Sequence, residues 1–494
     1  MSLWATTWYE LWFGNAFLDL SRSWTPAIIS FLLHDLIVIT TIPVLLLRRK
    51  EPTSTLAWIF AILLMPFFGA IFFLIFGNDR LRRKQRAREE SRKKLHRILP
   101  KFVQNLVSPI DVRGQLQLYR LLDGTVATNP VAGNDIEIYA NIHRNYDDQI
   151  QAINEASHHV HIEYYIVEPD SVGWRYHEAM IAAAKRGCQV RFLYDAIGTR
   201  KLGGRFLGEL HQAGVETASF IPVNLLTRNW IFNFRNHRKI VVCDGNVGFT
   251  GGANLGEEYV SQSEVGWWRD THLRVRGPIV LQLQRVFAED WAFATHQHLT
   301  DPVLFPDLEP QGKVVTQVVP GGPDTEVPVY HELYFSAVAN AVDRIRIVTP
   351  FFVPSEAITV ALQTAARRGV DVVVLVPKKS TKLLVRLAAC SYYEELLEAG
   401  VRIFEYERGF VHSKVMTVDR RWSIIGTANF DNRSMKLNFE VGVAMWDSEV
   451  TRQADELFDE DLRESTEVTL EQWRTRPITR QIAENFARLF SAIL

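Results

Sequence analysis

The sequence predicts an α/β body in which one structural unit occurs twice, preceded by a hairpin of two apolar helices that cross a membrane. Three observations predict this class. Two apolar runs cover residues 26–47 and 55–76. From about residue 130 onward, strand and helix patterns alternate, which is typical of a mostly parallel or mixed sheet with helices on both faces. Similar segments then recur about 180 residues apart, as expected of an internal repeat.

Composition and charge narrow the class. The chain has 494 residues, 47% hydrophobic and 22% charged, which excludes a disordered or fibrous protein. Its 55 basic and 56 acidic residues give a formal net charge of −1, so a global basic field for nucleic acid is absent. Cys188, Cys243 and Cys390 lie far apart without CxxC spacing, which argues against a zinc cluster or a disulfide framework and fits a reducing compartment.

Each apolar run has 22 residues, which as a helix is about 33 Å long and exceeds the roughly 30 Å hydrocarbon core of a bilayer. The second run carries no charge. The first contains His34 and Asp35, a pair that is costly at bilayer depth unless it faces protein, and whose role the sequence leaves open. A buried helical hairpin in a soluble core is the alternative. A cleaved signal peptide fits less well, because no basic segment precedes residue 26.

The charges beside these runs predict boundaries and an orientation. Residues 1–25 form an interfacial segment or a packed helix, residues 26–78 the two transmembrane helices, and residues 79–130 a basic juxtamembrane linker. Between Arg80 and Arg97 stand ten basic and two acidic residues, against three and one in the turn that follows the first run. Because excess Lys and Arg stay on the cytoplasmic side, we expect the linker and the body there.

The elements of the body follow in order. The β-branched and aromatic run 159–167 predicts a strand, and 176–186 has the period of a helix. Residues 189–194 predict a second strand, and 206–213 a helix that ends at Gly214.

Part of this pattern recurs later in the chain. AAAKRGCQVRFL at 182–193 resembles TAARRGVDVVVL at 364–375, and LGELHQAGV at 207–215 resembles YEELLEAGV at 393–401. Any two strand–helix units share some likeness, which is the alternative for these segments alone. The repeat predicts a first unit at 131–310 and a second at 311–494, related by a pseudo-twofold axis.

Two matched motifs carry the chemistry. The first is HRKIVVCD at 237–244 followed by GGAN at 251–254, and the second is HSKVMTVD at 412–419 followed by GTAN at 426–429. A lone HxK is weak evidence, and a single histidine is more often a satisfied core residue. Two copies that agree at five positions are specific.

The spacing has a physical reason. On a strand, residues i and i+2 share a face, so His237 and Lys239 point together, as do His412 and Lys414. The small residues after each motif let backbone approach a ligand, and Asn254 and Asn429 supply amide donors. The two halves together can frame one phosphate between two histidines.

With these motifs the chain resembles the phospholipase D superfamily, and more narrowly the bacterial cardiolipin synthases, over nearly all of its length. The resemblance rests on EPTSTLAW at 51–58, FTGGANLG at 249–256, WRDTHLRVRG at 268–277, TPFFVP at 349–354 and NFDNRS at 429–434. The ending ARLFSAIL at 487–494 also resembles the family, with Ala492 in place of an expected proline.

The resemblance implies a mechanism. One histidine attacks phosphorus to form a phosphohistidine, and the other protonates the leaving alkoxide and then deprotonates the incoming hydroxyl. By similarity His237 is the nucleophile and His412 the acid/base, although the symmetry of the motifs allows the reverse. The catalytic set is completed by residues that stabilise phosphoryl oxygens or orient a histidine: Lys239, Asn254, Asp270, Lys414, Asn429 and Glu440.

Two pairs of carboxylates have separate roles in this reading. Glu440 is expected to orient His412 and Asp270 to orient His237, each within its own half, with a strand-end salt bridge as the alternative for Asp270. Asp244 and Asp419 are expected to be structural turn residues. No metal and no cofactor is implied.

The reaction implied is phosphatidyl transfer, in which two phosphatidylglycerol molecules give cardiolipin and glycerol at a bacterial inner membrane. A hydrolytic phospholipase D is the nearest alternative, because both reactions share the intermediate. A tethered nuclease is disfavoured because the body lacks a basic stripe, so no nucleic-acid partner is expected. A non-catalytic scaffold is disfavoured because both motifs are intact. Residues 224–235 mix apolar and basic side chains and form either a lipid-facing lip or a buried strand and loop. The acceptor lipid and the oligomeric state stay open.

Overall fold

The structure is a computed structural model, and it describes residues 24–47, 52–76, 92–94, 115–126, 128–221, 234–263, 265–325, 327–492 and 494. The chain divides into two compact units, residues 1–80 and 81–494, which are described separately. The expected interfacial segment before residue 24, most of the basic linker and nearly all of the expected lipid-facing lip lie outside the described residues.

The described part of the first unit contains three helices, α2 (Trp24–Leu46), α3 (Pro52–Leu64) and α4 (Pro66–Phe76). The second apolar run is therefore two helices, whereas the sequence predicts one continuous span. The break is at Pro66, which has no N–H to donate to the carbonyl one turn earlier. Among the residues that the structure describes, no helix combines the length and the apolar character needed to cross a membrane.

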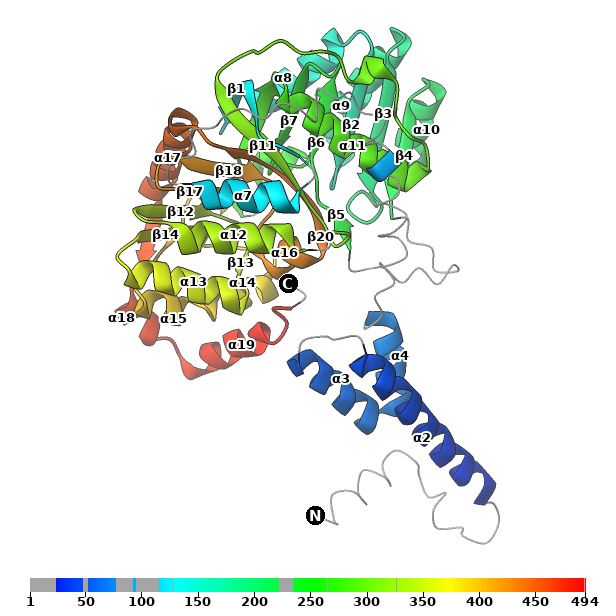
Figure 1. The fold of residues 1–494 in the computed structure, drawn as a ribbon, viewed down its shortest axis with the longest axis vertical. Coiled ribbons are helices and arrows are strands. Elements are labelled where there is room, and N and C mark those ends of the chain that lie inside the picture. The colour runs from blue at the N-terminus through cyan, green and yellow to red at the C-terminus, as the bar shows by residue number, and fades with distance from the viewer. Residues whose placement is uncertain are drawn as a thin grey trace. The chain divides into compact units, whose positions relative to one another are not determined.

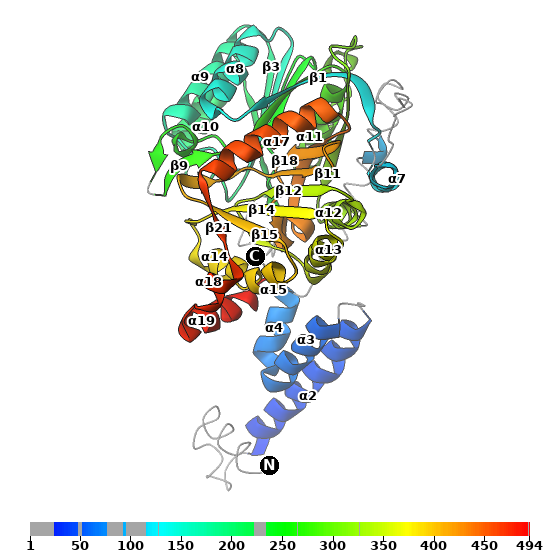
Figure 2. The ribbon, with the colours of Figure 1, turned by 90° about the vertical axis from the view of Figure 1, so that its left-hand side faces the viewer.

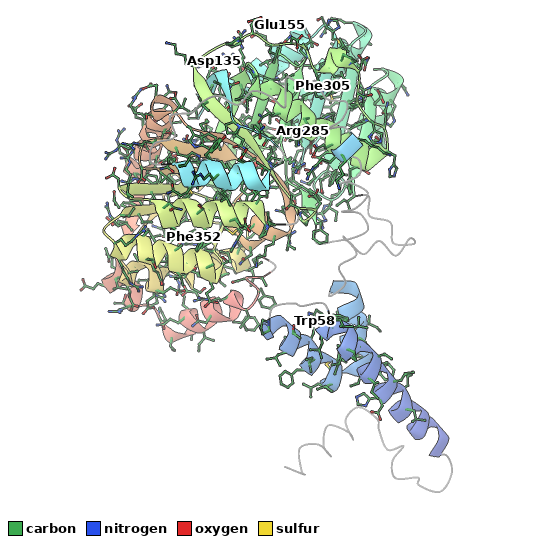
Figure 3. The ribbon with its side chains drawn as sticks, in the orientation of Figure 1. Trp58, Asp135, Glu155, Arg285, Phe305 and Phe352 are labelled. Carbon is green, nitrogen blue, oxygen red and sulfur yellow. The ribbon has the colours of Figure 1, made fainter. Side chains whose placement is uncertain are left out.

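Few side chains of this unit are buried. Leu45, Ile62 and Phe73 form a small core, and Trp58 packs edge-on against Phe73 with ring centroids 5.6 Å apart (Figure 3). Most other large apolar side chains point outward. His34 and Asp35 contact each other, with Nδ1 and Oδ1 3.6 Å apart.

In its described residues, the second unit is built on one long sheet of 16 strands, drawn in Figure 1: fifteen lie in a row, and β5 (Arg235–Asn236) pairs with one of them. The first half contributes, in spatial order, β1 (Val131–Tyr139), β10 (His272–Arg276), β7 (Val247–Gly251), β6 (Ile240–Cys243), β2 (His159–Tyr164), β3 (Gln189–Asp195) and β4 (Glu216–Phe220). The second half contributes β11 (Val314–Gly321), β20 (Asn438–Met445), β18 (Trp422–Gly426), β17 (Val415–Val418), β12 (Arg344–Val348), β14 (Asp371–Pro377), β15 (Arg402–Tyr406) and β21 (Ser465–Val468).

The two halves have the same strand order, and they meet where β1 pairs antiparallel with β11. In each half two strands run parallel to the strand equivalent to β2, as β3 and β4 do in the first. The duplicated α/β body predicted from the repeat is confirmed.

The helices repeat as well. The first half has α8 (Ile142–Glu155), α9 (Ser171–Lys185), α10 (Gly204–Gln212) and α11 (Ile279–Thr295). The second has α12 (Val329–Asn340), α13 (Glu356–Arg367), α14 (Leu383–Cys390), α15 (Tyr393–Glu398) and α17 (Ser448–Arg463), followed by α18 (Leu470–Arg474) and α19 (Ile478–Arg488) (Figure 2). Helices α11 and α17 share one apolar cluster that spans both halves.

Local sequence explains the ends of the repeated helices. Asp170 caps α9 and Ser355 caps α13, each accepting hydrogen bonds from backbone N–H groups of the first turn. Gly187 and Gly369 follow these helices with φ of +96° and +91°, a conformation that favours glycine. Because Asp170 begins the helix, α9 starts five residues earlier than the sequence periodicity predicts.

Part of the expected linker belongs to this folded unit. Helix α7 (Leu116–Thr125) buries Leu118 and Leu122 in the core of the second half. Arg92, from the basic run, forms an ion pair with Glu289, with Nε and Oε2 3.2 Å apart.

Candidate active site

Both HxK motifs lie in extended segments that enter a strand of the central sheet. His237 follows β5 (Arg235–Asn236) and Lys239 directly precedes β6. His412 follows β16 (Gly409–Val411), and Lys414 directly precedes β17. The motifs therefore stand just outside the strands on which the sequence places them, but histidine and lysine remain neighbours in each motif.

The carboxylate partners are exchanged between the halves. His237 Nδ1 lies 2.9 Å from Oε2 of Glu440, and His412 Nδ1 lies 2.7 Å from Oδ2 of Asp270. The expectation that each histidine is oriented by the acid of its own half is wrong.

Strand pairing between the halves explains the exchange. Strand β5 pairs in parallel with β20, so that the His237 N–H donates to the Phe439 carbonyl, next to Glu440. Strand β16 pairs with β9 (Gly266–Arg269), and the His412 N–H donates to the Arg269 carbonyl, next to Asp270.

The electrostatics favour neutral imidazoles beside ionised carboxylates. Burial lowers the pKa of His237 to about 4 and that of His412 to about 3. Burial alone would raise the pKa of Glu440, but the interaction and hydrogen bond with His237, the charge of Lys239 and the hydrogen bond from Thr427 bring it below its usual value. The pKa of Asp270 is lowered in the same way against its burial, by Lys414 and His412. With Nδ1 donating to a carboxylate, each neutral ring keeps its lone pair on Nε2, and at His412 this atom lies 3.1 Å from Lys414 Nζ.

The charged forms of the two lysines are destabilised. Burial and repulsion from Lys414 lower the pKa of Lys239 to about 7, and burial lowers that of Lys414 to about 8. Lys239 Nζ donates to the His237 carbonyl at 2.7 Å, whereas Lys414 Nζ lies 2.7 and 3.1 Å from the two ring nitrogens of His412. An anion bound between the halves would relieve this repulsion, so the site is suited to a phosphate group.

Both carboxylates are held rigidly. Glu440 Oε2 accepts from the Thr427 hydroxyl at 2.5 Å, and its Oε1 accepts from the Asn438 amide at 3.2 Å. Asp270 Oδ1 accepts from the Thr271 N–H at 2.7 Å. At Gly252, which corresponds to Thr427, a Cβ would lie 2.0 Å from Asp270 Oδ1, so only glycine fits there.

The motif asparagines make internal contacts. Asn254 donates from Nδ2 to the Tyr259 hydroxyl at 2.8 Å, and that hydroxyl lies 3.5 Å from His412 Nδ1. The amide of Asn429 donates to Asp431. At least one N–H of each amide therefore serves the protein rather than a phosphoryl oxygen.

The motif aspartates support the backbone. Asp244, with φ of +52°, accepts from the backbone N–H groups of residues 157–159. Asp419, with φ of +54°, accepts from those of residues 342–344. The two aspartates are equivalent, because each binds the backbone at the start of a strand, β2 in the first half and β12 in the second.

Sequence reasoning missed an aromatic wall around the histidines. The ring of His412 lies 5.3 Å from Trp268, 5.6 Å from Tyr259 and 5.8 Å from Phe410, measured between centroids. The ring of His237 lies 5.0 Å from that of Tyr165. Trp268 stands in a stretch that carries the family resemblance, which was a usable signal, whereas nothing in the spacing marks Tyr165 or Tyr259.

A buried arginine braces the site from behind. Arg238 donates from Nε to the Glu440 carbonyl at 3.0 Å, from Nη2 to the Gly321 carbonyl at 3.0 Å, and from Nη1 to Asp290. Glu163 lies behind Asn236, whose Nδ2 donates to it at 2.6 Å. Burial and the neighbouring Asp290 raise the pKa of Glu163 well above its usual value, which favours the neutral form of this carboxyl.

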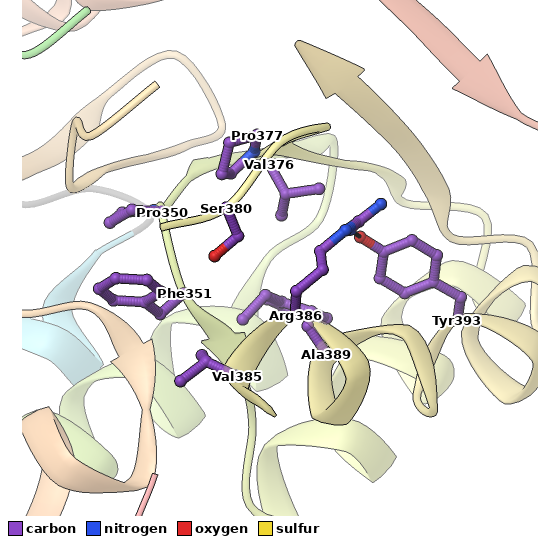
Figure 4. A pocket seen from close by; sticks show the side chains of 10 residues that line it. Pro350, Phe351, Val376, Pro377, Ser380, Val385, Arg386, Ala389 and Tyr393 are labelled. Carbon is purple, nitrogen blue, oxygen red and sulfur yellow. Dashed lines mark hydrogen bonds between the residues drawn. The ribbon is translucent and has the colours of Figure 1, made fainter. Parts of the chain in front are cut away.

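A small pocket lies beside the aromatic wall in the second half (Figure 4). Phe351 lines it and also contacts Phe410, with ring centroids 6.2 Å apart. Its one charged lining residue, Arg386, is bound to Glu405 and to the Tyr393 hydroxyl, so the pocket offers no free charge. Among the described residues no cluster of three or more His, Cys, Asp or Glu side chains could hold a metal ion.

Comparison with known proteins agrees with this geometry. A family model described as "Cardiolipin synthase, PLD-like domain" matches residues 149–291 and 334–462, and these two segments contain all eight candidate catalytic residues. The chain is 39% identical to a cardiolipin synthase of Geobacillus thermodenitrificans over 461 residues, which is 91% of each chain.

The chain belongs to the cardiolipin synthase family. It is also 36% identical to a cardiolipin synthase of Alkalihalophilus pseudofirmus over 501 residues, covering 100% of this chain and 99% of that one. A second model, "Phospholipase_D-nuclease N-terminal", matches residues 36–78. The resemblance stated from the motifs is confirmed, and with it the phosphatidyltransferase class.

The fold of the body has a solved counterpart. The phosphatidylserine synthase of Haemophilus influenzae aligns with a TM-score of 0.55 and 17% identity, over 73% of this chain and 95% of that one. At this identity the likeness concerns the fold alone.

Proposed function

We propose that the protein joins two phosphatidylglycerol molecules into cardiolipin and glycerol, through a phosphatidyl group carried on His237. One observation supports this above all: two buried histidines each direct Nδ1 at a carboxylate and leave Nε2 for chemistry. Such a pair supplies a nucleophile and an acid/base without a metal.

In the first step, His237 Nε2 attacks the phosphorus of one phosphatidylglycerol. The P–O bond to the glycerol headgroup breaks as the P–N bond forms, and the glycerol alkoxide takes a proton from His412. Burial and the charge of Lys414 depress the pKa of His412, but an anionic phosphodiester beside the ring favours its protonated form. Lys239 and Lys414 stabilise the charge on the phosphoryl oxygens.

In the second step, His412 accepts the proton of a hydroxyl on a second phosphatidylglycerol. This oxygen attacks phosphorus, the P–N bond to His237 breaks, and cardiolipin is formed. The assignment of His237 as the nucleophile is supported by an asymmetry. Both lysines donate to the backbone carbonyl of their own histidine, but Lys414 Nζ also lies 3.1 Å from His412 Nε2.

The experiment that tests this proposal uses the full-length protein with phosphatidylglycerol and EDTA. We expect cardiolipin and glycerol in equal amounts. Phosphatidic acid as the main product would instead identify a hydrolase, and loss of activity with chelator would contradict the metal-free mechanism. Trapping should label wild type at His237 and leave His237→Ala unlabelled, while His237→Ala and His412→Ala each remove nearly all turnover.

The first unit is proposed to sit in the bacterial inner membrane, with the body in the cytoplasm. Support comes from its exposed apolar surface, where Leu36, Ile39 and Leu64 are 58%, 69% and 79% exposed. The orientation rests on the excess of Lys and Arg between residues 80 and 97.

Single cysteines at Ser54 and Ser91 test this orientation, in a background without the native cysteines. With an impermeant thiol reagent, we expect labelling at residue 54 in intact cells and at residue 91 only after permeabilisation. The opposite pattern would reverse the orientation. Labelling of both positions in intact cells would mean that the segment does not span.

A further inference from the structure

The C-terminal helix α19 presents an apolar stripe to the outside of the second unit. Ile478, Ile482 and Phe486 follow at intervals of four, and Leu489 continues the same side of the helix. These four side chains are 67%, 62%, 60% and 76% exposed. The opposite side of the helix faces the body, where Glu484 and Ala487 are buried. A stripe of this size is unusual on a soluble surface and marks a contact region.

Two arginines border the stripe. Arg480 and Arg488 are the charged side chains that α19 exposes, at 47% and 41%, and Arg488 pairs with Glu395 at 2.8 Å. The only acid in the helix, Glu484, is 1% exposed and accepts from Arg476 at 3.1 Å and from Arg480 at 2.9 Å. Apolar residues on one side with arginines beside them are typical of a helix that lies in a membrane interface.

A neighbouring helix extends the apolar surface. Helix α14 packs against α19, and its first residues, Leu383 and Leu384, are 73% and 41% exposed. Figure 1 shows the two helices side by side at one edge of the second half. Together these two helices form a docking surface of six exposed apolar residues: Leu383, Leu384, Ile478, Ile482, Phe486 and Leu489.

The end of the chain after α19 is attached to the second catalytic motif. Asn432, three residues after Asn429, donates from Nδ2 to the Ser491 carbonyl at 3.0 Å. The Arg433 N–H donates to the Leu494 carbonyl at 3.1 Å. Both residues lie in α16 (Asn432–Lys436), which follows the motif directly. The position of α19 is thereby coupled to the segment that carries Asn429.

We propose that the docking surface inserts into the headgroup region of a bilayer containing anionic phospholipid and so holds the catalytic site against its substrates. This inference rests on the proposed function, because a lipid substrate has to reach the site from a membrane. The occupant is a lipid surface rather than a protein, since the exposed parts of Arg480 and Arg488 border the apolar stripe, where they can reach anionic headgroups, and the one acid of α19 is turned inward.

Fluorescence quenching tests the contact directly. The three native cysteines are buried, so a cysteine introduced at Ile482 can be labelled selectively with an environment-sensitive dye in the full-length chain. The labelled protein is reconstituted in phosphatidylglycerol vesicles with or without lipids that carry a nitroxide on the acyl chain. We expect the nitroxide lipids to quench the dye at residue 482 at least twofold more than a dye at Glu155, at the far end of α8 (Figure 3).

Equal quenching at the two positions would overturn the proposal. So would blue-shifted emission at residue 482 without quenching by nitroxide lipid, because the stripe would then be covered by protein. This readout needs no turnover, so its failure is distinct from failure of the proposed reaction.

Activity supplies the second arm. Ile482→Glu combined with Phe486→Glu should lower cardiolipin formation from vesicle phosphatidylglycerol about tenfold, which corresponds to about 1.4 kcal/mol. Turnover of a short-chain, monomeric phosphatidylglycerol should stay within about twofold, because this substrate reaches the site without a membrane. The control is Val360→Glu, which places one such charge on an exposed apolar residue of α13. An equal loss on both substrates, or an equal vesicle defect in Val360→Glu, would refute docking.

Discussion

Neutralising Glu440 and Asp270, the two carboxylates that pair with the motif histidines, one at a time should separate the roles of the two histidines. Glu440→Gln keeps the shape of the side chain and removes the charge that pairs with His237 Nδ1 at 2.9 Å. Asp270→Asn does the same for His412, whose Nδ1 lies 2.7 Å from that carboxylate. Because the pairs cross between the halves, Glu440→Gln should impair the proposed nucleophile and Asp270→Asn the proposed acid/base.

The geometry sets the size of the effect. A hydrogen bond to a charged group contributes about 1.5–3 kcal/mol, which corresponds to roughly 10- to 150-fold in rate. An amide can also donate to Nδ1 and favour the wrong tautomer, which costs about 10⁴-fold in the serine-protease triad. We therefore expect cardiolipin formation to fall at least about tenfold in each variant, with the triad value as the upper bound.

The assay follows release of p-nitrophenol from a phosphatidyl p-nitrophenol ester, which needs little help from an acid. Asp270→Asn should keep a rapid burst and then stall, because the phosphatidyl group forms on His237 but is not transferred. Glu440→Gln should lose the burst. The reverse pattern would place the nucleophile on His412, and equal loss of both phases in both variants would refute the division of roles. Glu163→Gln is the control, because burial raises the pKa of this carboxyl and its hydrogen bond goes to Asn236 rather than to a histidine, so activity should stay within about twofold.

Three further predictions follow from the same site. The pKa of Lys239 is about 7 and that of Lys414 about 8, so the two lysines lose positive charge as pH rises. KM for phosphatidylglycerol should therefore increase between pH 7 and 9, and a flat KM would contradict these assignments. Gly252→Ala brings a Cβ to 2.0 Å from Asp270 Oδ1, so activity should fall roughly 100-fold, and overpacking should lower the free energy of unfolding by about 1–3 kcal/mol. Thr427→Ser keeps the hydroxyl and should remain active in the same turnover and melting assays. Arg238→Met leaves the Asp290 carboxylate buried without this partner, and a loss of about 3–5 kcal/mol in unfolding free energy is expected, measured by denaturant titration of the detergent-solubilised protein.

In the first unit, composition identifies the apolar runs but does not determine how many helices each run forms. Two apolar runs of 22 residues predict two helices of spanning length, and apolar character is a property of composition that the sequence carries directly. Whether such a run is one helix depends on backbone hydrogen bonding, and Pro66 divides the second run into α3 and α4. The proline was visible in the sequence, but a proline can also be accommodated inside a helix, so its effect was decided by the packing of α4 against α3.

The sequence by itself determined the duplication and predicted which groups react. Gly187 and Gly369 end equivalent helices in a left-handed conformation, and the HxK spacing keeps each lysine beside its histidine, because both features depend on neighbours within a few residues. Only the tertiary structure decided which acid serves which histidine. Glu440 lies 203 residues from His237, and the contact is made by pairing β5 with β20 of the other half. No local period encodes such a pairing: it arises because the two halves bury a common sheet, and each completes the other's site.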